Sequence, residues 1–327
     1  MIHLHGLGHF HPEAEIDNAF FASIGLDTDE TWIQERVGIR TRRTVLPLDY
    51  IRATRNADPR AAREAALYDN AALGVGAAQL ALARSGLTPM DIGMVISGGC
   101  TSDYSIPPDA CRIAETLGIV APAFDLSASC ASFGAQLHWV GQLRPEASPD
   151  FVLLVQPEAN TRVVDYRDRA TAVLWGDGAA AAVVSLRVPA RIGVESTTMG
   201  SDPSGWRKVC TPHGGHFQQD GPAVQRFAVR RTREILGRLL ATSGPGTRFV
   251  GHQANLLMLE SACRQAGIPP ARHLYNVDAF GNTGAAGAPS VLSQHWDTLH
   301  AGEPVALAVV GAGLSWAGAV LSSATRE

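Results

Sequence analysis

The chain lacks the features that point to membranes, secretion or nucleic acids. Its 327 residues contain no run of about 18 or more apolar residues, so we expect no membrane span. The first residues, 1–5, have neither the basic nor the apolar region of a signal peptide, and we expect a cytoplasmic protein. The 27 Lys and Arg are outnumbered by 31 Asp and Glu. We therefore expect no nucleic-acid partner, because neutralising many phosphates requires a basic surface.

Cysteine is scarce, and its spacing excludes two common roles. The five cysteines are odd in number and show no C-x-x-C spacing, which argues against both a disulfide framework and a zinc site. We therefore expect no bound metal. In a reducing compartment most cysteines of this kind are small, buried hydrophobic residues. We assign that structural role to Cys100, Cys111, Cys210 and Cys263, and only Cys130 has surroundings that indicate chemistry.

Apolar, β-rich runs alternate with Ala- and Leu-rich helical stretches along the chain. Residues 71–85 have helical spacing and end at Gly86, and Asp58 followed by Pro59 is typical of a helix start. Continuous apolar runs indicate buried strands, which we predict at 94–97, 151–156, 249–250 and 305–310. The alternation predicts an α/β chain, and its length suggests about two domains.

Two distant segments of the chain resemble each other. Residues 174–185 read LWGDGAAAAVVS, and residues 310–322 read VGAGLSWAGAVLS. Each has a G-x-G turn followed by small and β-branched residues and ends in serine. This echo indicates a duplicated α/β unit with halves at 1–185 and 186–327, although an echo this short also arises by coincidence.

Cys130 lies in the segment 124–134, FDLSASCASFG, among small residues. Residues 131–143 then read as a helix with one apolar face, which would place the thiol at a helix N-terminus. Unsatisfied amides and the helix dipole favour the reactive thiolate there. From this segment alone two interpretations stay open: a nucleophile, or a structural cysteine packed beside Ala128 and Ala131.

Two further segments carry polar side chains after predicted strands. Residues 251–257, GHQANLL, place His252 at a strand end, where an imidazole can donate a hydrogen bond to a carbonyl or activate a nucleophile. Residues 280–286, FGNTGAA, place Asn282 between glycines that give a ligand access to the backbone. Alone, His252 is equally a helix-capping surface residue, and the Gly-Asn-Thr-Gly run is equally a turn.

Together, in this order and spacing, the three segments resemble the Cys–His–Asn triad of β-ketoacyl-acyl-carrier-protein synthase III, a family of the thiolase superfamily. The resemblance covers nearly the whole chain. Four more segments also match the family. Residues 29–43 look like the family's W-I-x-x-R-x-G-I-x-x-R stretch. Three others match its pocket-lining, G-D-G-A-G and C-terminal glycine-rich stretches, and they lie at 101–111, 175–183 and 311–319.

This resemblance implies a five-layered αβαβα thiolase fold of two duplicated halves and an obligate homodimer. It implies that Cys130 accepts an acyl group from a thioester. His252 and Asn282 would hydrogen-bond the thioester carbonyl of the second substrate. The amides of Cys130 and Ala312 would form an oxyanion hole. Fixed donors of this kind are worth about 3 kcal/mol each to a developing oxyanion, and no cofactor is needed beyond coenzyme A or phosphopantetheine thioesters as substrates.

The resemblance also places residues at the substrate entrance and along the acyl chain. Trp32 and Arg169 fall where the family holds the coenzyme A adenine, and Arg36 falls where it contacts nucleotide phosphates. Stacking and positive charge suit an anionic cofactor with a flat base. A solvated helix face is the alternative for Trp32 and Arg36. Ile106, contributed by the partner subunit, and Gly221 are assigned to the acyl pocket.

The chain departs from the family pattern at several places. Leu257 stands where the family has an arginine that attracts the acidic carrier protein, and although Arg264 is nearby, we expect weaker steering of a carrier or a different docking surface. Ile106 replaces a frequent bulky aromatic, which suggests a longer or branched acyl group. Residues 45–69 are longer than expected, and they read as a loop or as a lid over the acyl pocket. Gly284 and Gly287 replace common serines, and Ala312 replaces the middle glycine of the C-terminal stretch. Together these changes suggest a specialised branch.

The leading hypothesis is a decarboxylating Claisen condensation between the Cys130 acyl group and a malonyl- or β-ketoacyl-thioester. An acyltransferase to an alcohol or amine is the runner-up. Joining of two acyl chains without decarboxylation would need a base, which the sequence does not identify. A non-catalytic partner subunit is disfavoured because Cys130, His252 and Asn282 are all retained.

Overall fold

The computed structural model describes residues 1–244, 246–299 and 303–323, in which the strands of the main sheet follow the order β12-β11-β13-β14-β8-β1-β7-β6-β4-β5. Their bounds are β1 Ile2–Phe10, β4 Ile92–Ser97, β5 Ala123–Asp125, β6 Phe151–Glu158, β7 Gly178–Ser185, β8 Ile192–Ser201, β11 Arg248–Gly251, β12 His273–Leu274, β13 Val305–Gly311 and β14 Ser315–Ser323. All four predicted strands are present within these bounds.

The strand pairing is the same in the two halves of the sheet. In the first half β1–β7 and β7–β6 are antiparallel, whereas β6–β4 and β4–β5 are parallel. In the second half β8–β14 and β14–β13 are antiparallel, whereas β13–β11 and β11–β12 are parallel. The echo segments end in β7 and β14, which hold equivalent places. β1 and β8 join the halves by a short antiparallel pairing.

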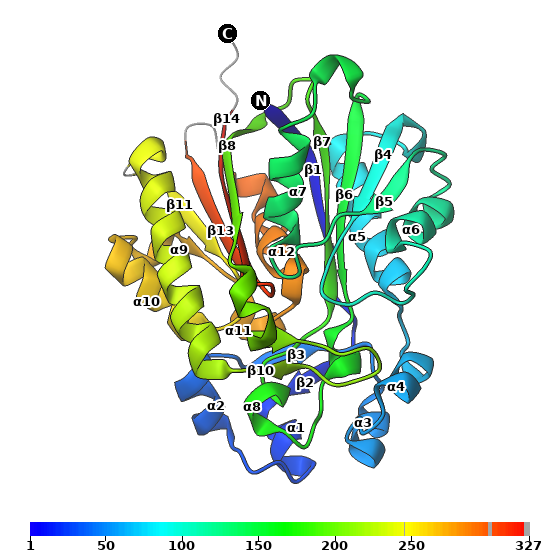
Figure 1. Ribbon diagram of the computed structural model, residues 1–327, viewed down its shortest axis with the longest axis vertical. Helices are drawn as coiled ribbons and strands as arrows, with labels where there is room; N and C mark the ends of the chain where they lie inside the picture. Colours follow the sequence, from blue (N-terminus) through cyan, green and yellow to red (C-terminus); the bar gives the residue numbers. More distant parts are fainter. Residues whose placement is uncertain (245, 300–302, 324–327) are drawn as a thin grey trace.

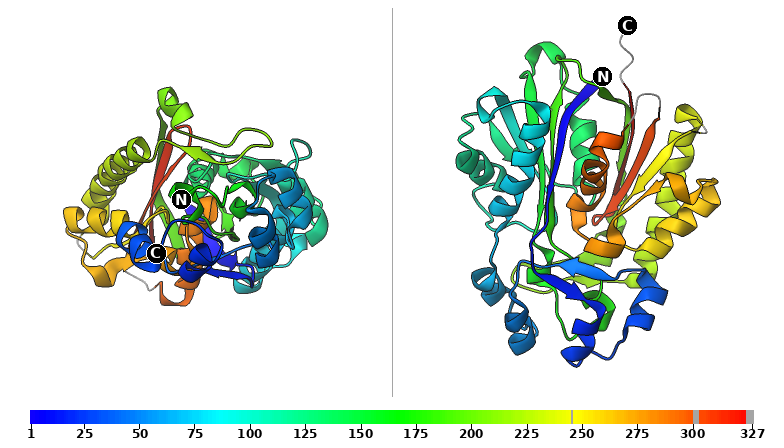
Figure 2. Two further views of the ribbon diagram at one scale, coloured as in Figure 1. Left: turned by 90° about the horizontal axis from the view of Figure 1, so that it is seen from below. Right: turned by 180° about the vertical axis from the view of Figure 1, so that it is seen from behind.

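Helices separate and cover the two halves of the sheet, which gives the five-layered αβαβα arrangement (Figure 1). α7 and α12 lie between the halves, because α7 contacts β6, β8 and β14 while α12 contacts β1, β7 and β11. α5 and α6 cover one outer face, and α9 and α10 cover the other. Figure 2 shows the same layers end-on and from behind. The helix bounds are α5 Asn70–Ser85, α6 Asp109–Leu117, α7 Ser132–Val140, α9 Gly221–Ser243, α10 Leu256–Ala266 and α12 Gly287–Gln294.

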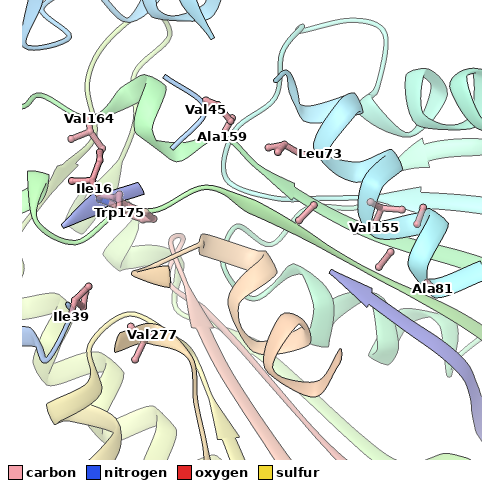
Figure 3. Packing of buried hydrophobic residues seen from close by; sticks show 14 of the residues in the cluster. Ile16, Ile39, Val45, Leu73, Ala81, Val155, Ala159, Val164, Trp175 and Val277 are labelled. Atoms are coloured by element: carbon pink, nitrogen blue, oxygen red, sulfur yellow. The ribbon is translucent and has the colours of Figure 1, made fainter. Parts of the chain in front are cut away.

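The outer helix α5 packs closely against the strands behind it. Gly6 and Gly8 of β1 lie against the backbone of α5, where any Cβ would collide with the carbonyl oxygens of Ala81 and Ala77. Leu73 and Ala81 of α5 belong to the same buried cluster as Val155 of β6 (Figure 3). The helix begins after the N-cap Asp69, and Gly86 ends it in the left-handed conformation (φ 70°), as predicted.

Short elements from residues 11–69 and 160–220 cap the end of the sheet at which the parallel strands finish (Figure 1). They comprise β2 Glu15–Asp17, α1 Asn18–Ser23, α2 Glu30–Val37, β3 Thr41–Arg43, α3 Leu48–Thr54, α4 Pro59–Ala65, α8 Arg169–Ala172, β9 Val209–Cys210 and β10 Gln218–Gln219; α11 Val277–Phe280 precedes α12. Residues 45–69 therefore contain two short helices, not a plain loop. Val45, Leu46 and Ile51 are fully buried, so this segment is anchored in the core.

In the described part of the chain, no helix is long and apolar enough to cross a membrane.

Candidate active site

The predicted triad is brought together in one cavity of about 410 Å³. Cys130, His252, Asn282 and Ala312 all line it, although they come from four separate connections of the chain. These connections follow β5, β11, β12 and β13. β11, β12 and β13 are parallel neighbours, so the connections after them lie at one edge of the sheet. Cys130 comes from the other half and reaches this place at the start of α7, which packs between the halves against β13 and β14.

A strained turn presents Cys130 directly before α7. Ser129 has φ 51°, a conformation that costs a non-glycine residue energy and recurs at functional sites. The turn is held by the Ser132 hydroxyl, which accepts from the Ala128 amide at 3.0 Å. Gly311 of β13 packs onto this turn so closely that a Cβ would lie 3.1 Å from the Cys130 nitrogen. A larger residue at 311 would therefore displace the nucleophile.

The surroundings of Cys130 favour its thiolate. The Cys100 sulfur lies 3.3 Å from the Cys130 sulfur. This hydrogen bond and the neighbouring His252 hold the pKa of the Cys130 thiol well below its usual range, against the opposing effect of desolvation. We take Cys100 as the donor, because the hydrogen bond, burial and the nearby Glu158 carboxylate all raise the pKa of its own thiol. A lowered pKa increases the nucleophilic fraction at neutral pH.

His252 follows β11, and hydrogen bonds of its own backbone and of the neighbouring Gln253 hold it in place. Its amide donates to the Ala308 carbonyl at 3.0 Å. Gln253 is fully buried and accepts from the amides of Asn276 and Val277 at 3.0 and 3.2 Å, which ties the His252 loop to α11. The ring nitrogen Nδ1 of His252 is buried and has no hydrogen-bond partner among the described residues.

Asn282 is oriented so that its amide nitrogen is available. Its Oδ1 accepts from the Gly284 amide at 3.0 Å, and its backbone amide donates to the Leu174 carbonyl at 2.8 Å. Since Oδ1 is occupied, Nδ2 is the group that faces a ligand as a donor. Gly281 precedes it with φ 67° and packs against Arg42, where a Cβ would lie 2.7 Å from that side chain.

Glu158 is a site residue that the sequence motifs do not reveal. It ends β6, is fully buried, and accepts from the amides of Cys100 and Ala285 at 3.0 and 2.7 Å. Burial and the nearby Cys130 charge raise the pKa of Glu158 to about 8. The one sequence signal for Glu158 is its position at the end of a buried apolar strand. A charged side chain is costly to bury there unless it is paired or hydrogen-bonded.

The three residues assigned to coenzyme A lie together beside the cavity. Trp32 and Arg36 line it, and the guanidinium carbons of Arg36 and Arg169 lie 4.9 and 5.0 Å from the Trp32 ring centre. Arg169 also forms an exposed ion pair with Asp27 at 3.0 Å. Asn255, at the start of α10, donates to the Arg36 carbonyl at 3.0 Å and fixes α2 beside His252.

The two acyl-pocket assignments fall in different places. Gly221 lines the Cys130 cavity at the first residue of α9. Ile106 is 84% exposed and does not line that cavity within its own chain. Its assignment therefore depends on a second copy of the protein.

A second cavity of about 350 Å³ adjoins the first at Cys130. Five residues line both cavities: Cys130, Trp175, Val209, Phe217 and Ala312. Cys100 lines only the second of the two. The remaining lining residues of the second cavity mix polar and apolar side chains, and they include Thr101, Asn160, Val163, Trp206 and Cys210. Cys100 and Cys210, assigned only structural roles from the sequence, thus lie at the site. Among the described residues no group of three or more His, Cys, Asp or Glu side chains is arranged to hold a metal.

Comparison with known proteins agrees with this geometry. Residues 124–203 match the model of the 3-oxoacyl-[acyl-carrier-protein] synthase III family, and residues 246–323 match its C-terminal model. A β-ketoacyl-[acyl-carrier-protein] synthase III of Deinococcus radiodurans is 32% identical over 96% of this chain and 92% of its own. The crystal structure of the Pseudomonas aeruginosa 3-oxoacyl-(acyl carrier protein) synthase III superposes with a TM-score of 0.85 at 30% identity, covering 100% of this chain and 99% of that one.

The fold and the grouped thiol, imidazole and amide define a condensing enzyme with the thiolase fold. The chain belongs to the β-ketoacyl-[acyl-carrier-protein] synthase III family. A similar structure is the priming β-ketosynthase of a polyketide biosynthetic pathway, with a TM-score of 0.84 and 29% identity over 100% of this chain and 97% of that one.

Proposed function

We propose that this protein accepts an acyl group on Cys130 and condenses it with a malonyl- or β-ketoacyl-thioester, with release of CO2. The observation that carries the proposal is the meeting of Cys130, His252, Asn282 and Ala312 in one cavity. The thiolate supplies a nucleophile, and the two polar side chains supply donors for an enolate. Acyl transfer alone would not require these two side-chain donors, His252 and Asn282.

The two cavities suggest how the substrates are arranged. The arm of a thioester enters past Trp32 and Arg36, and its acyl group extends beyond Cys130 into the second cavity. A space of about 350 Å³ exceeds the need of an acetyl group, which supports a longer or branched acyl chain. We therefore assign the protein to a specialised fatty-acid or polyketide pathway. Acyl transfer to an alcohol or amine remains the second candidate.

The acyl donor arrives on coenzyme A, on an acyl carrier protein, or on both. The names of the relatives specify a carrier protein, and this chain offers a basic surface for one on α9, which starts at the cavity. Arg226, Arg230 and Arg233 are exposed on that helix. These arginines are a different docking surface from the site at which Leu257 replaces the family's arginine.

The proposal is tested by intact-protein mass after mixing the enzyme with acyl-CoAs of graded chain length. We expect a mass gain equal to the acyl group, absent in Cys130→Ala, and greatest with chains longer than acetyl. Malonyl-CoA should then discharge the acyl-enzyme with release of CO2. Discharge by alcohols or amines without CO2 would instead favour acyl transfer, and labelling that persists in Cys130→Ala would overturn the proposal.

A further inference from the structure

The active site contains a second thiol that the condensation mechanism does not use. Cys100 and Cys130 follow the neighbouring parallel strands β4 and β5, and their sulfurs lie 3.3 Å apart. We propose that Cys100 and Cys130 are a reversible oxidation site that closes to a disulfide when the protein meets hydrogen peroxide or an organic hydroperoxide. The proposal concerns the thiols alone and does not depend on Cys130 carrying an acyl group.

The backbone holds the two thiol-bearing loops side by side. The Leu126 amide donates to the Ser97 carbonyl at 2.8 Å, and the Ser127 hydroxyl donates to the Gly99 carbonyl at 2.7 Å. A disulfide requires a sulfur–sulfur distance of about 2.05 Å. The sulfurs therefore need to approach by about 1.2 Å, which rotation about the side-chain bonds of two cysteines readily supplies.

Glu158 fixes the Cys100 side of the pair. Both of its carboxylate oxygens accept from the Cys100 amide at 3.0 Å. On the other side, the Ser315 hydroxyl donates to the Ala128 carbonyl at 3.1 Å and holds the turn that presents Cys130. These hydrogen bonds of the folded protein thus hold the two thiols facing each other.

The reaction balances with a hydroperoxide as the only oxidant. The Cys130 thiolate attacks the peroxide oxygen, breaks the O–O bond and becomes a sulfenic acid, while hydroxide or an alkoxide leaves. The Cys100 sulfur then attacks the Cys130 sulfur, an S–S bond forms, and the sulfenic oxygen leaves as water with the Cys100 proton. The thiols together lose two electrons and two protons, and the peroxide is reduced to water or to water and an alcohol.

Access and reactivity support this sequence of steps. Both thiols line the second cavity of about 350 Å³, and both are only partly buried. The lowered pKa of Cys130 makes it the thiol that reacts first. A disulfide there would block acylation, and it would also protect the nucleophile from irreversible oxidation to sulfinic and sulfonic acids.

Cys210 provides a matched control for this inference. It lines the same cavity as Cys100 and Cys130, but it has no hydrogen bond to either sulfur within the described part of the chain. If proximity within the cavity were sufficient, Cys210 would be as good a partner as Cys100. The direct 3.3 Å contact predicts that it is not.

The test is peroxide treatment of the full-length protein, followed by intact mass and non-reducing peptide mapping. We expect the loss of two hydrogen atoms, a peptide linking Cys100 to Cys130, and full recovery of Cys130 alkylation after dithiothreitol. Cys210→Ala should respond like the wild type. Cys100→Ala and Cys100→Ser should instead accumulate Cys130 with two or three added oxygen atoms that dithiothreitol does not remove.

Two results would overturn the inference. One is a wild-type map in which Cys130 is over-oxidised without any Cys100–Cys130 peptide. The other is a link between Cys130 and Cys210 that survives in Cys100→Ala. The wild-type map decides even if a Cys100 variant does not fold. Failure of acylation by every thioester would contradict the proposed function and leave this result unaffected.

Discussion

At the carboxyl end of β6, the Glu158 side chain is enclosed by backbone amides from the Cys100 and Asn282 loops. A carboxyl group in such a place costs desolvation energy, which its hydrogen bonds only partly offset. Gly284 is required beside it, because its φ is 57° and a Cβ there would collide with the carboxylate. The glycine that replaces the family's serine at 284 thus has a local steric reason.

The shifted pKa of Glu158 predicts a specific pH dependence of stability. Its folded pKa is about 8 against an ordinary value of 4.5, so the folded state retains a proton that the unfolded state has lost between these values. Stability should therefore fall as pH rises through this window, by up to about 1.4 kcal/mol per pH unit. Glu158→Gln should lose this part of the slope in urea denaturation at several pH values. The exposed Glu64→Gln should keep it, and equal slopes in all three proteins would contradict the assignment.

Site residues could be predicted from the sequence where they lie in a recognisable motif. Residues that reach the site only through the folding of the chain could not. Cys130, His252 and Asn282 stand in recognisable segments, and the structure places them in one cavity. Cys100 and Glu158 are 30 and 28 positions from Cys130, and their contacts arise because β4, β5 and β6 are neighbours in the sheet. No local pattern reports such a contact.

At the scale of elements, the first turn of α9 lines the cavity that holds Cys130. Gly221 lines the cavity, and a Cβ at this position would meet nothing within 4 Å. Gly221→Leu should therefore extend into the cavity and raise the half-saturating concentration of acyl-CoA about tenfold, or ~1.4 kcal/mol. Alkylation of Cys130 by iodoacetamide should remain at the wild-type rate because the reagent is small. Gly237→Leu, on the same helix and also facing open space, is the control; equal effects of both variants would contradict this account.

The arginines of α9 predict a difference between carrier-borne and coenzyme A-borne substrates. Arg226→Glu with Arg230→Glu should lower the rate with an acyl carrier protein on the order of tenfold at low salt, and less at high salt. The rate with acyl-CoA should change much less. Arg144→Glu, beyond the far end of α7, is the matched control. Equal losses with both substrates would remove α9 as the docking surface.

The boundaries of elements were predicted best where both patterning and caps are present. The helix α5 and the start of α4 at Pro59 agree with the sequence prediction. The helix after Cys130 was predicted at 131–143 but spans Ser132–Val140. Beyond it the amides of Gln142 and Leu143 bond to carbonyls only three residues back, so the chain continues in tighter turns and the α-helical pattern ends. Residues 45–69 gave no periodicity, since α3 and α4 are short and are held by buried tertiary contacts.

At the scale of the whole molecule, the two halves share one strand pattern, and each contributes to the site. Cys130 follows β5 of the first half, whereas His252 and Asn282 follow β11 and β12 of the second. The short echo in the sequence indicated the duplication only together with the family resemblance, which implied two similar halves. It did not contain the strand pairing that relates the halves, and the division at residues 185 and 186 stays a prediction.

The edge of the sheet beside β5 predicts a homodimer. β5 is the last strand in the sheet order, and the apolar side chains of Ile106 and Val120 on this side of the molecule are 84% and 101% exposed. Light scattering after size exclusion should give twice the chain mass of 34.6 kDa. Ile106→Asp should shift the protein toward monomer, whereas Met90→Asp, a residue that is also 84% exposed, should not. A wild-type monomer would contradict this prediction.

The most direct test of the central claim separates acylation from condensation. Purified acyl-enzyme of the wild type, His252→Ala and Asn282→Ala is mixed with carboxyl-labelled malonyl-CoA, and released CO2 is measured. All three proteins should carry an acyl group on Cys130, but each variant should release CO2 on the order of 10²–10³-fold more slowly, because one fixed donor to the enolate is lost. Release of CO2 at the wild-type rate by both variants would contradict the assignment of these two side chains to decarboxylative condensation.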